Sequence, residues 1–393
     1  MRKRKFGRLA AWLLPLALAA ALLPGIGMTA LATDSGIVPP ARAAAVDDKV
    51  TFTFHGGGKS ITLTHGQYIK ECKPGASIIT VDSFIQYPDY AAFYYGGVLY
   101  LQGDYNGVYI FLPNKESQIT LVGDLTMSNS SFPLYVHNYK TTIDLSGHVM
   151  TLNVETIITS DIYGIKATDV EITGKTGSIL NINTSVANDN HDHYAKNVWG
   201  IKAENDVRIL GNTQVNLNIN GGGGLSAEAK VAGIDAKTVE IRGSSKVNIE
   251  VNGHSIDLTR ADYYRKTGAE GGRINTAIAA SVLNIQDSSS LDILSHKNVI
   301  SDICLGSNNS DDALYLNTSG YLNITNEGKI STGAGSTTLY PKYNIYASSG
   351  DINILGAEDG VTIDSLSQLL SNGDGMWTPG SSPWDIFTGS SIK

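Results

Sequence analysis

Short runs of alternating apolar and polar residues follow one another along the chain, and one pattern of them recurs after residue 160. A Gly-Ile-x-Ala phrase is followed by a Val-x-Ile or Leu-x-Ile doublet. Alternate side chains of a strand share one face, so each doublet predicts a short strand with one apolar side. A phrase that recurs about every 30 to 45 residues is typical of a solenoid. The clear copies begin at Tyr163, Trp199 and Ala232, and the fainter ones at Thr276, Ala313 and Asn344.

Stacking these copies predicts continuous apolar columns. Each copy ends in a third doublet, such as Val247-Asn-Ile249, after a polar corner. Three short strands separated by corners make one coil, and about eight coils fit between the predicted ends. The sequence therefore predicts an all-β fold, a parallel β-helix. A β-sandwich is the alternative, although it does not require the same residue types in the same phase of every copy. The predicted columns are Ile165, Ile201, Ile234, Ile278, Leu314 and Ile345; Ala167, Ala203, Ala236, Ala280, Leu316 and Ala347; and Ile172, Ile209, Ile241, Ile285, Ile324 and Ile354.

The first residues have the pattern of a secretory signal peptide. A basic head precedes an apolar run from Leu9 to Leu23, and Ala30-Leu-Ala32 is a small-x-small cleavage site. A retained membrane anchor is the alternative. We therefore expect a secreted or cell-surface protein with no transmembrane segment after cleavage. The predicted organisation is a signal peptide at 1–32, a flexible linker at 33–46, an N-terminal cap at 47–97, the β-helix at 98–363 and a C-terminal cap or tail at 364–393.

The net charge bears on the kind of partner, and the cysteine positions bear on whether the fold has a disulfide. The formal charge of −8 argues against nucleic acid as the partner. Cys72 and Cys304 are the only cysteines. They are predicted to lie about six coils apart, at roughly 4.8 Å per coil. A disulfide spans at most about 7 Å between Cα atoms, so we expect two separate thiols. Exposed coil edges would also allow end-to-end self-association.

Four variable connections contain the candidate binding residues. They span 186–198, 254–275, 297–312 and 335–343, and they are predicted to leave the same corner of the coil. Aromatic faces stack on sugar rings, and charged groups bind hydroxyls or carboxylates. Solvated loops whose aromatic rings pack on one another are the alternative. The candidate ligand-binding residues are Tyr194, Trp199, Arg260, Tyr263, Tyr264, Arg265, Arg273 and Tyr340.

Two other groups of residues are candidates for binding. Asp302, Asp311 and Asp312 could supply oxygen ligands for calcium, with solvated aspartates as the alternative. His191-Asp-His193 is a weaker metal candidate because it has no evident third ligand. The tyrosine-rich segment 87–109 is either a second sugar platform or self-association surface, or a set of strands packed in the cap.

The segment from Ile119 to His148 resembles the opening coils of pectate-lyase-like right-handed β-helix proteins. The Gly-Ile-Lys-Ala phrases resemble a secreted bacterial carbohydrate-binding family of that superfamily, over roughly 119–363. The resemblance implies a right-handed helix and a non-catalytic protein that binds plant polysaccharide, often with calcium. In that family an acidic pair often precedes Gly-Ile, whereas Tyr163, Trp199 and Ala232 stand there in this chain. The family's calcium sites are therefore not transferred.

The sequence thus favours a non-catalytic protein that binds polysaccharide, either a host or a cell-wall glycan. A structural surface protein or adhesin without a small-molecule site is the first alternative. A calcium-dependent polysaccharide lyase or a glycoside hydrolase is less favoured, because no acidic cluster repeats from coil to coil and paired carboxylates are not evident. No catalytic residue is assigned.

Overall fold

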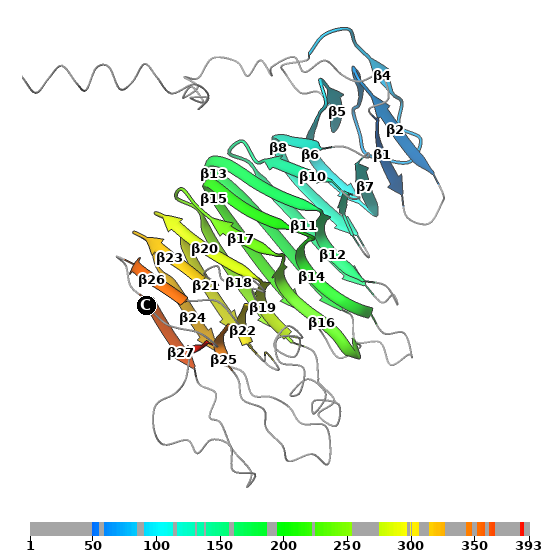
Figure 1. The fold of residues 1–393 in the computed structure, drawn as a ribbon. Coiled ribbons are helices and arrows are strands. Elements are labelled where there is room, and N and C mark those ends of the chain that lie inside the picture. Colours follow the sequence, from blue (N-terminus) through cyan, green and yellow to red (C-terminus); the bar gives the residue numbers. More distant parts are fainter. Residues whose placement is uncertain are drawn as a thin grey trace, which may run out of the picture. The chain divides into compact units, whose positions relative to one another are not determined.

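The computed structural model contains strands and no helix in the residues that it describes, which confirms the all-β prediction (Figure 1). None of the described segments is therefore a long apolar helix of the kind that crosses a membrane. The predicted signal peptide and linker lie outside the described residues. Those residues are 49–54, 59–84, 90–112, 116–129, 132–136, 139–156, 161–186, 195–221, 225–253, 275–296, 299, 301–305, 314–326, 343–347, 352–357, 361–365 and 386–388.

From residue 98 onward, strands of successive repeats pair in parallel, and they do so in three ladders (Figure 1). Along the chain, a strand of the first ladder is followed by one of the second and one of the third. This pairing differs from that of a β-sandwich, whose sheets are antiparallel. The first ladder contains β7 (Val108–Leu112), β9 (Leu134–Val136), β12 (Ile162–Ala167), β14 (Ala195–Ala203), β16 (Leu225–Asp235), β19 (Asn275–Ala280), β22 (Ser301–Leu305), β25 (Tyr343–Ala347) and β28 (Ile386–Thr388).

The second and third ladders share four strands that pair over two stretches. In β13 and β15 the two stretches are separated by an irregularity between Gly174 and Ser178. The shared strands are β6 (Val98–Asn106), β8 (Ser117–Asn129), β13 (Asp169–Val186) and β15 (Asp206–Asn220). The second ladder also has β10 (Lys140–Asp144), β17 (Thr238–Ile241), β20 (Val282–Asp287), β23 (Leu314–Thr318) and β26 (Ile352–Ala357). The third also has β11 (Val149–Thr156), β18 (Lys246–Asn252), β21 (Ser290–Ser295), β24 (Leu322–Asn326) and β27 (Val361–Ser365).

The sheets are mixed, because the first strands pair antiparallel. Strand β1 (Lys49–Phe54) pairs with β2 (Ser60–Thr64) and with β7. It therefore covers the free edge of β7, which is the first strand of the first ladder. In the same way β5 (Ala92–Tyr95) pairs antiparallel with β6. Pairing leaves fewer free backbone groups at these edges. The remaining strands of this region are β3 (Gln67–Ile69) and β4 (Ile79–Thr80), which pair with each other.

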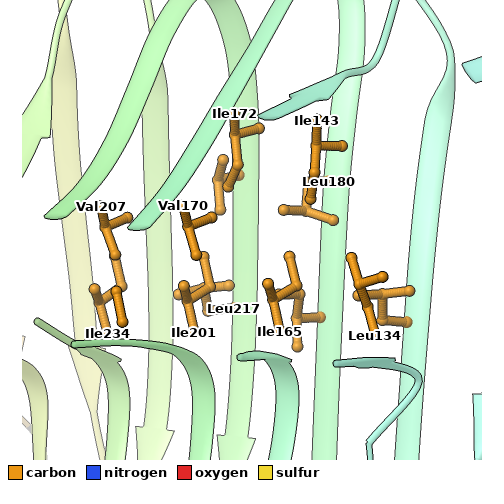
Figure 2. Packing of buried hydrophobic residues seen from close by; sticks show 14 of the residues in the cluster. Leu134, Ile143, Ile165, Val170, Ile172, Leu180, Ile201, Val207, Leu217 and Ile234 are labelled. Atoms are coloured by element: carbon orange, nitrogen blue, oxygen red, sulfur yellow. The ribbon is translucent and has the colours of Figure 1, made fainter. Parts of the chain in front are cut away.

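The core consists of aliphatic side chains in register between the ladders. Ile165, Ile201 and Ile234 pair in sequence on β12, β14 and β16, and all three are fully buried. Figure 2 shows them in one row with Leu134. The predicted column is therefore confirmed here, and it continues through Ile278. β-branched residues at these positions suit both the strand and the packing.

The predicted columns are wrong at the copy that begins at Ala313. Strand β22 lies inside the predicted loop 297–312, and its Ile303 and Leu305 stand in the places expected for Leu314 and Leu316. Those two leucines belong to the second ladder, and Ile324 pairs with Ile293 in the third. The sequence of β22, Ser-Asp-Ile-Cys-Leu, has neither the glycine nor the alanine of the phrase. The next apolar doublet, Leu314-Tyr-Leu316, was therefore predicted as the first-ladder strand of this copy.

The two cysteines are separate thiols, as expected. Neither Cys72 nor Cys304 forms a disulfide. Burial raises the pKa of the Cys72 thiol to about 12, so the thiolate is disfavoured there. The fold accordingly depends on packing and backbone pairing without this covalent link.

The glycine of the phrase is required by close packing. Ile162 and Ile165 both belong to the core although they are three residues apart, so strict alternation is interrupted at Gly164. On the next strand, a Cβ atom at Gly200 would lie 2.7 Å from the Gly233 carbonyl oxygen and 2.9 Å from Cδ1 of Ile219. Both distances are too short for a real side chain.

We predict that Gly200→Ala lowers the melting temperature, because the backbone on one side and a core isoleucine on the other must shift. Overpacking of this kind costs about 1 to 3 kcal/mol. Gly123→Ala is the control, since the three atoms nearest to its Cβ all belong to the Gln102 side chain and none to the backbone. Equal losses in the two variants, measured by circular dichroism, would contradict this account.

An asparagine ladder covers the outward side of the third ladder. Nδ2 of Asn248 donates to Oδ1 of Asn216 at 2.7 Å, and Nδ2 of Asn216 donates to Oδ1 of Asn181 at 2.8 Å. Gln214 also donates to Asn216, at 3.0 Å. The two bonds between asparagines join residues that are paired in the backbone register. They therefore lock successive strands together from outside the core.

Asn216→Ala should destabilise the fold by about 1 to 2 kcal/mol, because it leaves three partly buried polar groups without their partner. Asn218→Ala on the same strand is the matched control: Asn218 is exposed and its side chain makes no hydrogen bond within the described residues. Thermal denaturation of both variants measures the difference. If Asn218→Ala lowers the melting temperature as much as Asn216→Ala does, the asparagine hydrogen bonds do not stabilise the fold as proposed.

Candidate functional site

The outward face of the first ladder carries aromatic and charged residues. Ile165 and Ala167 face the core, so Lys166 between them faces outward. In backbone register, Lys166 pairs with Tyr135 on β9 and with Lys202 on β14. Lys202 in turn pairs with Asp235 on β16. One such outward residue therefore stands on each successive strand.

Aromatic rings form a continuous series on this face. Phe111 and Tyr135 lie with centroids 5.9 Å apart, and Phe132 lies 5.6 Å from Tyr135. Offset or tilted contacts at such distances are favourable. Four of the rings are partly exposed and two are buried. The series, called here the aromatic strip, consists of Tyr109, Phe111, Phe132, Tyr135, Tyr163 and Trp199.

Trp199 is held tightly at one end of the strip. Its ring stacks on Tyr163 at 5.1 Å with an interplanar angle of 6°. Its Nε1–H donates to Oδ2 of Asp235 at 3.1 Å, and Nζ of Lys202 lies 2.8 Å from the same oxygen. Trp199 is 6% exposed and Asp235 is 8% exposed. The indole is thus fixed by its neighbours, and its predicted role in sugar stacking stays a prediction.

Lys166 has a different environment from Lys202. Its ammonium nitrogen lies 4.8 Å from the ring centroid of Tyr163 and 5.5 Å from that of Tyr135. It also lies 3.4 Å from the Tyr163 hydroxyl, which itself donates to Asp161 at 2.9 Å. Within the described residues Lys166 forms no ion pair. It is therefore a cation between two rings, and no residue of the described segments is its acidic partner.

The predicted binding residues fall mostly outside the described residues. Trp199 is the one candidate ligand-binding residue inside them, on β14. Asp302 lies on β22 and is fully buried, so its assignment to a loop is wrong. The other candidates all lie outside the described residues: Tyr194, Arg260, Tyr263, Tyr264, Arg265, Arg273, Tyr340, Asp311 and Asp312.

The three aspartates do not share one connection. Asp302 is part of β22, whereas Asp311 and Asp312 follow it, between the first and second ladders. The other three predicted loops run from the third ladder to the first. In the described segments, no three or more His, Cys, Asp or Glu side chains gather as a metal site would require. Calcium binding by Asp302, Asp311 and Asp312 stays a prediction.

Most of the described tyrosines between Tyr90 and Tyr105 are packed in the structure. Phe93 is at the centre of an aromatic cluster with Tyr90 and Tyr100, at centroid distances of 5.2 and 6.0 Å. Tyr105 is fully buried, and its hydroxyl donates to the Ala91 carbonyl oxygen at 2.6 Å. For these tyrosines the structural alternative agrees with the observation, whereas Tyr109 belongs to the aromatic strip and Tyr87 lies outside the described residues.

The strip contains residues that sequence reasoning did not select. Phe111, Tyr135 and Lys166 lie on strands and outside the long connections, where the sequence predicted binding. Their signal was nevertheless present: the residue between the isoleucine and the alanine of each phrase must face outward. The residue before its glycine, as in Tyr163 and Trp199, belongs to a small buried cluster that is separate from the main core.

No family model, no curated protein and no solved structure matches this chain. The resemblance to carbohydrate-binding β-helix proteins therefore depends on the quoted phrases. The function has to be inferred from the geometry of the strip itself.

Burial makes several tyrosines hard to ionise. Burial raises the pKa of the Tyr100 phenol to about 12, and the neighbouring Tyr95 adds to the effect. Burial also raises the pKa values of Tyr90, Tyr105 and Tyr163 well above the usual value. At Tyr163 the Asp161 carboxylate contributes in the same direction. The folded state therefore holds these phenols protonated.

We predict that stability falls as the pH rises above about 10, where tyrosines of the unfolded chain ionise. The folded pKa values are raised, so the stabilisation is complete below the unfolded pKa and is lost as the pH approaches the folded values. Tyrosinate absorbance should show a late group of phenols, and Tyr163→Phe should remove one of them. Titration of every tyrosine in a single step near the usual pKa would contradict the prediction.

Proposed function

We propose that this chain is a secreted or cell-surface, non-catalytic polysaccharide-binding protein. Its scaffold in this proposal is a right-handed parallel β-helix of about eight coils, with three short strands per coil and terminal caps. The cyclic order of the three parallel ladders supports the helix. The antiparallel strands β1 and β5 support an N-terminal cap.

The aromatic strip is the observation that carries this proposal. Phe111, Phe132 and Tyr135 are partly exposed and contact one another. Aromatic faces bind the apolar faces of sugar rings, and the hydroxyls of the sugar find partners beside them. Because Phe111 and Tyr135 lie on successive strands, a chain of sugars could follow the ladder from strand to strand. A rigid sheet also keeps these rings in place before binding, which lowers the entropic cost.

The carboxylates of the strip are engaged in structural contacts. Asp235 accepts from Trp199 and pairs with Lys202. Asp161 accepts from Tyr163 and from Nδ2 of Asn197, the latter at 2.8 Å. Carboxylates held in this way are poorly suited to exchange protons with a substrate. This arrangement favours binding over glycan cleavage.

A structural surface protein remains the second candidate function, supported by the side-chain ladders of the other faces. Arg208 on β15 pairs with Glu240 on β17 at 3.5 Å, and Arg242 pairs with Asp287 on β20 at 3.5 Å. These contacts link successive strands of the second ladder. A scaffold or adhesin stalk needs only such contacts and no glycan site.

Tyr135→Ala should weaken polysaccharide binding about five- to tenfold, because it removes a central ring of the strip. Affinity electrophoresis on a panel of polysaccharides measures the change. Tyr139→Ala is the control: Tyr139 is also exposed, at 37%, but lies outside the strip. If the wild-type chain binds none of the polysaccharides, or if both variants bind as well as wild type, the structural role is favoured.

A further inference from the structure

We propose that the glycan bound by the strip is anionic and that Lys166 binds its carboxylate. This inference rests on the proposed function and assigns the chemical class of its ligand. It starts from the difference between two lysines at the same place in successive strands. Lys166 and Lys202 occupy paired positions in the backbone register of β12 and β14.

The two lysines differ in their partners. The Lys202 ammonium is neutralised by Asp235 at 2.8 Å, and it lies 5.6 Å from the ring centroid of Trp199. The Lys166 ammonium has two rings and a phenol oxygen around it, and no carboxylate within ion-pair distance in the described part of the chain. The Tyr163 hydroxyl beside Lys166 donates to Asp161, a carboxylate that also accepts a hydrogen bond from Asn197. A charge on the ligand can therefore complete the Lys166 site.

The position of Lys166 fits a sugar acid in particular. The ring of Tyr135 lies beside the ammonium and continues to Phe111 in the exposed part of the strip. A sugar ring stacked on these aromatics would bring a carboxylate on its edge towards Lys166. A lysine–carboxylate bond is charge-assisted and stronger than a bond to a neutral hydroxyl. Contacts with Tyr163 and Tyr135 restrict the lysine side chain before the ligand arrives, which favours binding.

The charge of the whole chain does not explain such a preference. A formal charge of −8 repels an anionic polymer at long range. Selectivity for an anionic glycan must then come from a local cation such as Lys166. Removing this one charge should have a large effect, whereas removing a lysine elsewhere should not.

The test compares polyuronates with their carboxyl-reduced forms, which keep the sugar chain and lose the charge. Polygalacturonate, alginate and hyaluronan are the probes, and the full chain is used in buffer with EDTA so that bridging calcium plays no part. The wild-type protein should bind at least one polyuronate at least about tenfold more tightly than its reduced form. Lys166→Gln should abolish this preference, so that the polyuronate and its reduced form bind with similar affinity, and Lys166→Arg should retain it.

Lys246→Gln is the matched control. Lys246 also lies over one ring, 5.8 Å from the centroid of Tyr321, but it is on the third ladder. Equal binding of charged and reduced glycans by wild type, or an undiminished preference in Lys166→Gln, would overturn the inference. The proposed function would survive that result if Tyr135→Ala still weakened binding. Loss of preference in the Lys246 control would likewise reject a specific role for Lys166, and absence of binding to every glycan would reject both.

Discussion

The register between parallel strands is the constraint on which the rest of this protein depends. Each strand must bring its apolar residues level with those of the strands before and after it, as Ile165, Ile201 and Ile234 do. A shift by one residue would turn the aliphatic side outward and the polar side inward. Because the same register also aligns the outward residues, the core and the outer faces are specified together. The asparagine ladder and the aromatic strip are both consequences of it.

The core was largely predictable from the chain, because its requirements repeat. The phrase at Tyr163, Trp199 and Ala232 places glycine where a side chain would collide with the next strand. The prediction was wrong where β22 meets the same backbone requirement with different residues. Burial of Ile303 and Leu305 needs no glycine or alanine, so the repeat there left no visible phrase. A sequence repeat identifies only those strands that have the same residue types. Strands of different sequence, such as β22, can still pair in the same register.

The candidate site was less predictable, because its properties come from neighbours on other strands. Trp199 was recognised as an aromatic residue beside a variable connection, but its burial follows from Tyr163 and Asp235, which are distant in sequence. Lys166 and Lys202 stand in identical Gly-Ile-Lys-Ala phrases. The two lysines differ in the residue that faces them on the next strand. Asp235 faces Lys202 and neutralises it, whereas Lys202 faces Lys166, which keeps its charge for a ligand.

The distribution of polar contacts explains why we place function on the first ladder. On the third ladder, asparagine side chains bond to one another across strands. On the second, arginines form ion pairs with acidic residues of the next strand. Groups that are already paired gain little from a ligand, because binding would exchange one partner for another. On the first ladder, partly exposed rings such as Tyr135 and the cation of Lys166 retain interactions that a ligand can still supply. Affinity should therefore arise there.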